Sequence, residues 1–188
     1  MDFLHILHER EKLLHIKHDS LERSDIIRHI LAIHTAFSFS LKIKRDNKLL
    51  KNPENSRYIN DKYILNLTSW KVVQLSFMYM DSFLAKCNII HNIDIALACY
   101  ILAYRYDNDD NSRGIYNFIY QNSGSKYSLH VITIEKYIWQ HVLRFSMNLP
   151  TPIDFISDNE PAIFISTKLM MNHIELPSVI AKMSLSLT

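Results

Sequence analysis

The sequence predicts an all-α protein, and three observations point to that class. Only 2 Gly and 5 Pro occur in 188 residues, so few positions accept the positive φ that the tight turns of a many-stranded protein need. Apolar residues make up 48% of the chain, which is enough for a globular core. Those residues recur three and four positions apart over long stretches, the spacing that is typical of helices with one buried face.

We expect two helices within residues 1–41. The first covers residues 2–18, where apolar side chains alternate with charged ones. The second follows Ser24 and Asp25, because both residue types can cap the first turn of a helix. This second helix is a candidate first helix of the main bundle.

Residues 42–66 are predicted to be a polar insertion or loop, since they contain few apolar residues and include Pro53. Basic residues gather at 42–51, where they could form a patch. No aromatic residues lie between them and the net charge of the chain is only +2, so a solvated insertion is favoured over a nucleic-acid site.

Residues 67–157 are predicted to form the core of the fold. The expected helices carry apolar stripes and are separated by polar turns; they cover 68–86, 92–106, 114–121 and 131–145. Thr68 or Ser69 can cap the first of them and Asn92 the second. Residues 158–188 are expected to add a partial second lobe, with helices that start near Pro161 and Pro177.

Several classes of site are excluded or disfavoured. Gly114 and Gly124 stand alone, so no phosphate-binding glycine loop is present. Cys87 and Cys99 do not make a disulfide framework, which favours a reducing, intracellular location in the nucleus or cytoplasm. The ten histidines follow no zinc-ligand spacing. We therefore expect no catalytic residue, metal, cofactor or membrane partner.

Five segments in order resemble the cyclin box: IRHIL (27–31), YMDSFL (79–84), IDIALACYILAYRYDND (93–109), TIEKYIWQHVLRF (133–145) with the following SMNLPTPIDFI, and LPSVIAKMSLSL (176–187). The resemblance implies a five-helix cyclin-box bundle with an N-terminal helix and a partial second lobe. It also implies a non-catalytic regulatory subunit, which binds and activates a cyclin-dependent protein kinase by packing on the αC helix of the kinase.

The resemblance assigns the kinase contact to the third and fifth helices of the box. Arg105 takes the place of a lysine that contacts the kinase in the family. Counting back from Phe145 puts the position of the family's fifth-helix glutamate at Lys136, whereas the acidic residue is Glu135, one position earlier. Both Glu135 and Lys136 are therefore candidates.

The resemblance also assigns structural residues. They are Asp81, Phe83, Ala103, Pro150 and Pro177. Ser82 replaces an arginine that pairs with the aspartate in the family, so Asp81 needs another partner. Ile27, Arg28 and Leu31 correspond to a groove for substrate docking motifs, although His34 replaces the family's tryptophan there.

Two other functions stay open. A cyclin-fold transcription factor related to TFIIB would bind DNA, and the near-neutral charge argues against it. A cyclin-like decoy would bind a kinase without activating it, and the altered positions at Ser82, His34 and Lys136 keep that alternative open.

Overall fold

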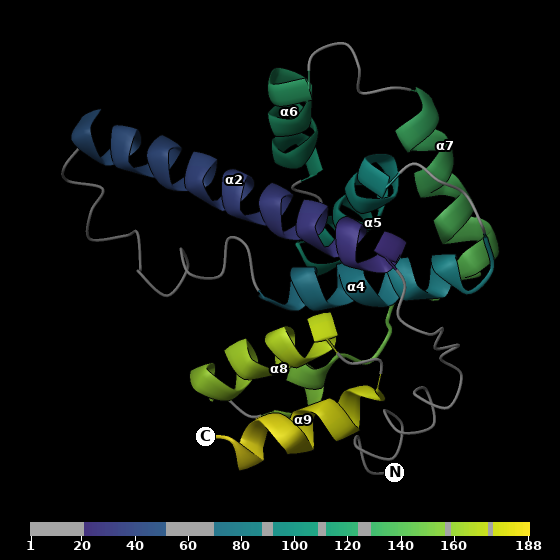
Figure 1. Ribbon diagram of the computed structural model, residues 1–188. Helices are drawn as coiled ribbons and strands as arrows, with labels where there is room; N and C mark the ends of the chain where they lie inside the picture. Colours follow the sequence, from purple (N-terminus) through teal and green to yellow (C-terminus); the bar gives the residue numbers. More distant parts are fainter. Residues whose placement is uncertain are drawn as a thin grey trace.

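The computed structural model describes residues 21–51, 70–87, 92–108, 112–123, 129–156, 159–172 and 175–188 (Figure 1). These residues are helical and contain no strand, so the predicted all-α class is confirmed for them. The predicted helix at 2–18 and the predicted caps Thr68 and Ser69 lie outside the described residues.

The helices of the described residues follow one another in chain order. Their bounds are α2 Leu21–Lys51, α4 Trp70–Leu84, α5 Asn92–Asp107, α6 Ser112–Ser123, α7 Leu129–Tyr137 with its π-helical continuation η4 Ile138–Val142, the 3-10 turn η5 Pro152–Phe155, α8 Glu160–Asn172 and α9 Pro177–Ser186.

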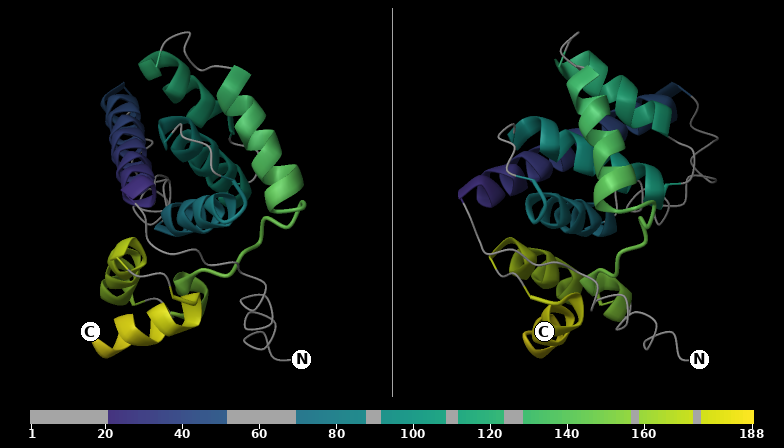
Figure 2. Two further views of the ribbon diagram at one scale, coloured as in Figure 1. Left: turned by 45° about the vertical axis from the view of Figure 1, so that its right-hand side comes forward. Right: turned by 90° about the vertical axis from the view of Figure 1, so that its right-hand side faces the viewer.

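Helix α5 is the centre of the main bundle, and α2, α4, α6 and α7 pack around it (Figure 2). Residues on every side of α5 are buried, as expected of a helix without a solvent-facing stripe. Ala96, Ala98 and Ala103 are fully buried, and their small side chains let the neighbouring helices approach closely. Tyr100 lies fully buried between them and fills the larger spaces.

Helix α4 separates the main bundle from a smaller unit made of η5, α8 and α9 (Figure 2). It is therefore buried on two sides, which explains why polar Gln74 and Ser76 are fully buried along with its apolar residues. The Gln74 amide donates to the hydroxyls of Ser166 (2.9 Å) and Thr167 (3.0 Å) on α8. Its oxygen accepts from the backbone N–H of Ile153 at 3.2 Å. One side chain thus ties α8 and η5 to the main bundle.

Helix α2 corrects the predicted loop at 42–66 for residues 42–51, because the helix continues without a break to Lys51; residues 52–66 lie outside the described ranges. No Gly or Pro interrupts residues 42–51, and Lys, Leu and Arg all favour helix. The start was also wrong: α2 begins at Leu21, so Ser24 and Asp25 lie inside it and cap nothing. The Asp25 carboxylate instead accepts a hydrogen bond from the Asn92 amide at 2.8 Å, at the start of α5.

The apolar stretch of α2 from Leu21 to Lys44 is long enough to cross a membrane by length and composition. In the fold this stretch serves as a core helix of the bundle, since Ile26, Ile30 and Phe37 are buried against neighbouring helices. Buried Arg23 on the same face would be costly in lipid. Composition alone therefore misrepresents the role of this helix.

The predicted helix at 131–145 changes form before its end. Regular α-helix stops at Tyr137, and the next five residues are π-helical. The Leu143 N–H donates to the carbonyl of Ile138, five residues back, at 2.8 Å. Arg144 and Phe145 then adopt positive φ values of 49° and 65°, which turns the chain toward η5.

Candidate functional site

Arg105 and Glu135 meet on one surface of the main bundle, although they are 30 residues apart in sequence. The guanidinium Nη1 of Arg105 lies 2.5 Å from Glu135 Oε1. Tyr116 on α6 joins them: Arg105 Nη1 donates to its hydroxyl at 3.3 Å, and that hydroxyl donates to Glu135 Oε1 at 3.2 Å. Helices α5, α6 and α7 therefore each contribute one polar side chain to this Arg105–Tyr116–Glu135 cluster.

The members of this cluster differ in their exposure. The Glu135 side chain is 7% exposed and that of Arg105 is 47% exposed, so the carboxylate is buried beneath the surface and the guanidinium lies at the surface. Burial and the Glu135 carboxylate raise the pKa of Tyr116, which keeps the phenol protonated as a donor. Within the described residues, Arg105 uses only Nη1 in these contacts. Its remaining N–H groups are available to an acceptor on a partner.

The π-helical η4 explains why counting back along α7 led to Lys136. A π-helical turn holds one more residue than the α-helix it replaces. The extra residue lies between Glu135 and Phe145, so it shifts a count that starts at Phe145 by one position. The side chain that faces Arg105 belongs to Glu135, whereas Lys136 is exposed.

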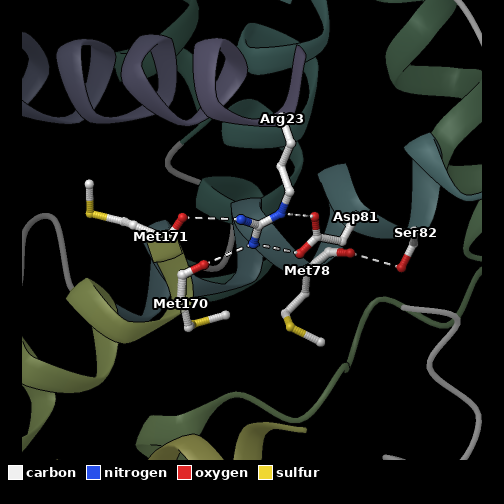
Figure 3. A network of polar contacts seen from close by, with 6 residues as sticks. All are labelled: Arg23, Met78, Asp81, Ser82, Met170 and Met171. Carbon is white, nitrogen blue, oxygen red and sulfur yellow. Dashed lines mark hydrogen bonds and ion pairs between the residues drawn. The ribbon is translucent and has the colours of Figure 1, made fainter. Parts of the chain in front are cut away.

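Asp81 has the substitute partner that the replacement by Ser82 required (Figure 3). Arg23 near the start of α2 donates from Nε to Asp81 Oδ1 at 2.7 Å and from Nη2 to Asp81 Oδ2 at 3.2 Å. The same guanidinium donates to the carbonyls of Met170 (2.8 Å) and Met171 (3.2 Å) in the last turn of α8. Ser82 turns away and donates to the Met78 carbonyl of its own helix.

This Arg23 brace joins three helices at one point. Carbonyls in the last turn of a helix have no partner within that helix, so the guanidinium satisfies two acceptors of α8 that would otherwise lack donors. The Arg23 side chain is 3% exposed. A buried charge with a bidentate carboxylate partner and further acceptors is a structural feature, and it leaves no donor free for a ligand.

The other structural residues that the resemblance assigned are buried. Phe83 and Ala103 lie in the core with 1% and 0% exposure. Pro177 is buried in the first turn of α9, where its missing N–H leaves no donor unsatisfied. Pro150 is buried in the extended segment that leads to η5.

One of the three residues predicted to line a docking groove, Ile27, is not accessible at the surface. Ile27 is 2% exposed and belongs to the core, so it cannot line a groove. Arg28 is exposed and Leu31 is partly buried. One hundred degrees of helix rotation separate neighbouring residues, which places Ile27 on the inner face and Arg28 on the outer one. The structure therefore does not bring the three residues together on one surface.

Arg23, Tyr116 and His34 were missed as important residues by the sequence reasoning. A signal existed for two of them, because Arg23 and His34 fall on the buried stripe of α2 that also contains Ile26, Ile30 and Phe37. Polar residues on a buried stripe need partners. Nothing in the spacing of Tyr116 distinguishes it from the other tyrosines.

His34 fills its place in the core as a neutral base. Its Nδ1 lies 3.0 Å from the Tyr100 hydroxyl, and its ring stacks near Trp70 with a centroid distance of 5.3 Å. Burial lowers the pKa of His34 to about 4. The imidazole is therefore uncharged at neutral pH.

The described residues offer little for catalysis or metal binding. Cys99 is fully buried, and burial raises the pKa of its thiol, so it is a poor nucleophile. Within the described ranges, no three His, Cys, Asp or Glu side chains converge to hold a metal ion. The Arg105–Tyr116–Glu135 cluster is suited to binding a polar group of a partner.

Comparison with known proteins adds no relative: no family model, curated protein or solved structure matches the chain.

Proposed function

We propose that the chain is a cyclin-like regulatory subunit that binds a cyclin-dependent protein kinase and activates it. One observation carries the proposal. Arg105 and Glu135, which the resemblance assigns to kinase contact, are brought into a single cluster on the surface of the bundle. The contact between two residues that the resemblance selected 30 positions apart in sequence supports the proposal.

The arrangement of helices supports the same proposal. The resemblance names the third and fifth helices of a box as the kinase-binding pair, and α5 and α7 pack against each other beside α6. Tyr106 on α5, Tyr120 on α6 and Trp139 on η4 are exposed aromatic side chains of the same helices or their continuation. Aromatic residues and arginine are the types enriched at the centres of protein interfaces.

The proposed mechanism is a shift of a conformational equilibrium in the kinase. A protein kinase is active only when the glutamate of its αC helix pairs with the lysine of strand β3. A subunit that packs on the αC helix in this position favours the active state by its differential affinity. A preference of about 5.5 kcal/mol is enough to change a two-state kinase from about 1:99 to about 99:1.

Within this proposal Arg105 supplies the contact and Glu135 orients it. Glu135 and Tyr116 hold Nη1 from below, so the planar guanidinium is fixed with its outer edge toward solvent. A backbone carbonyl or a carboxylate of the kinase can accept from that edge. Prior fixation by Glu135 reduces the entropy that is lost on binding.

The test is affinity capture from a eukaryotic cell lysate with the full chain as bait, followed by assay of the eluate for kinase activity on histone. We expect captured activity with the wild-type chain and at least a tenfold loss with Arg105→Glu, because reversal of one central charge pair typically costs more than about 1.4 kcal/mol. Lys182→Glu is the matched control, since it reverses an exposed charge on α9, outside the helices of the proposed contact. Equal capture by Arg105→Glu and wild type would refute the assignment.

Binding without activation is a second candidate, and the position of Ile27 favours it. This residue lies in the core, so the chain lacks the predicted groove through which a cyclin would recruit substrates. The same capture separates the two candidates: a bound but inactive kinase supports a decoy, and a bound active kinase supports the regulatory subunit.

A further inference from the structure

The C-terminal half of α2 extends beyond the other helices of the main bundle (Figure 1). The buried stripe of α2 ends with Phe37, which packs against Tyr104 and Phe118, and with partly buried Leu41. We call residues 38–51 of α2 the projecting arm. It is a helix in which positions 39, 42, 43, 44 and 47 are exposed.

The projecting arm exposes large apolar side chains. Phe39 is 63% exposed and Ile43 is 44% exposed, one helical turn apart on the same side. Among the described residues these are the large apolar side chains that α2 leaves in solvent after its first turn. A stripe of this kind is costly in water unless something covers it.

The same arm is strongly basic. Residues 42–51 read KIKRDNKLLK, with basic residues at five positions and a single acid, Asp46. Lys42 and Lys44 are exposed, and they lie on either side of Ile43 around the helix. An exposed apolar strip is thus flanked by cationic side chains on both sides.

We propose that the projecting arm binds the surface of an anionic membrane. A helix with an apolar strip between lysines lies in the interface of a bilayer, where the strip enters the acyl boundary and the lysine stems reach the headgroups. Neither feature alone is sufficient, because stable attachment takes both an apolar insertion and attraction to anionic lipid. The arm has both within three turns.

Other acidic partners explain these features less well. A DNA duplex offers phosphates to the lysines but no apolar layer for Phe39 and Ile43. A specific protein interface buries about 800 Å² per partner with matching shape, and two exposed apolar side chains on a single convex helix provide little of that. A lipid surface needs no shape complementarity.

The expectation of no membrane partner comes from the absence of an apolar run long enough to span a bilayer. A helix that lies in the membrane interface needs no such run. The inference concerns peripheral attachment by α2 and is independent of the proposed kinase contact, which uses α5, α6 and α7.

The experiment is flotation of the full chain with vesicles of phosphatidylcholine alone and with vesicles containing about 30% phosphatidylserine. We expect the chain to float with the anionic vesicles, and the bound fraction to fall at high salt. Lys42→Glu combined with Lys44→Glu should lower the partition coefficient at least about tenfold. Phe39→Ser combined with Ile43→Ser should lower it severalfold.

The matched control is Lys136→Glu combined with Lys182→Glu, two exposed lysines on α7 and α9. It makes the same change of net charge as the variant of the arm. Circular dichroism of each variant checks that the fold is retained, as expected for substitutions at exposed positions.

Each of three results would overturn the proposal. The first is failure of the chain to float with either vesicle. The second is an equal loss of vesicle binding in the control and in the Lys42/Lys44 variant, and the third is vesicle binding that replacement of Phe39 and Ile43 leaves unchanged. Salt-dependent binding to a DNA duplex without vesicle binding would also overturn it, and would assign the arm to nucleic acid.

Discussion

Two arginine–carboxylate pairs of this protein have similar chemistry and opposite surroundings. Arg23–Asp81 lies at the junction of α2, α4 and α8 with the arginine side chain 3% exposed. Arg105–Glu135 lies on the outer surface of α5 and α7 with the arginine side chain 47% exposed. The first guanidinium donates to four acceptors in two other helices, and the second directs only Nη1 inward.

The difference shows how one interaction type serves structure in one place and recognition in another. A buried pair with all its donors satisfied cannot be reached by a ligand, and breaking it leaves an uncompensated charge. A pair at the surface loses little when it is broken, because water replaces the partner. Stability measurements on the two arginines should therefore differ much more than their geometry suggests.

The largest expected effect is that of Arg23→Met. The substitution removes the donors that Arg23 supplies to the Asp81 carboxylate and to the carbonyls of Met170 and Met171. We expect a loss of about 3–5 kcal/mol in the free energy of unfolding, measured by urea denaturation followed by circular dichroism.

Arg28→Met is the control for Arg23→Met. Arg28 is an exposed arginine on the same helix, and its replacement should cost less than about 0.5 kcal/mol. Replacement of both members of the pair, Arg23→Met with Asp81→Leu, should cost less than the sum of the single changes. A loss below about 1 kcal/mol for Arg23→Met would show that the brace is dispensable.

A smaller effect on stability is expected from a change of pH. It comes from His34 on α2 and does not involve either arginine pair. Arginine keeps its charge at every physiological pH, whereas the pKa of His34 falls from 6.5 to about 4 on folding. Between these values the unfolded chain binds more protons than the folded one, so stability decreases as the pH falls through this window. This residue alone should remove about 2 kcal/mol between pH 7 and pH 5.

The measurement compares urea denaturation of the wild-type chain and of His34→Gln at pH 7 and pH 5. Glutamine keeps an acceptor for the Tyr100 hydroxyl and does not titrate. Most of the loss of stability at pH 5 should be absent from the variant. An equal pH dependence in the two proteins would assign the effect to the exposed histidines instead.

The sequence predicted the helices better than their ends. Apolar spacing located α4, α5, α8 and α9, because those helices bury one face or more and contain few breakers. It failed for residues 42–51, where a polar composition suggested a loop although nothing in the segment breaks a helix. Apolar periodicity reveals a helix that buries one face, and the exposed projecting arm has no such buried face.

The candidate site shows the same limit in a different form. Arg105 and Glu135 were both chosen from sequence, and their meeting in space required the packing of α5 against α7. The choice between Glu135 and Lys136 could not be made by counting, since a π-helical insertion leaves no mark in the composition of α7. Arg23 was overlooked because its partner is 58 residues away.

Of the arginine-pair substitutions, Arg105→Met is expected to have the smaller effect on stability. Its result tests whether the Arg105–Glu135 pair serves recognition while the Arg23–Asp81 pair serves structure. Glu135 keeps the Tyr116 hydroxyl as a donor and the methionine retains the apolar stem, so the free energy of unfolding should fall by about 1 kcal/mol or less. If Arg105 belongs to a recognition surface, kinase capture should nevertheless fall about tenfold or more. A loss of stability as large as that of Arg23→Met would instead make the Arg105–Glu135 pair a second structural brace. In that case weaker capture by the variant could not be attributed to a lost contact.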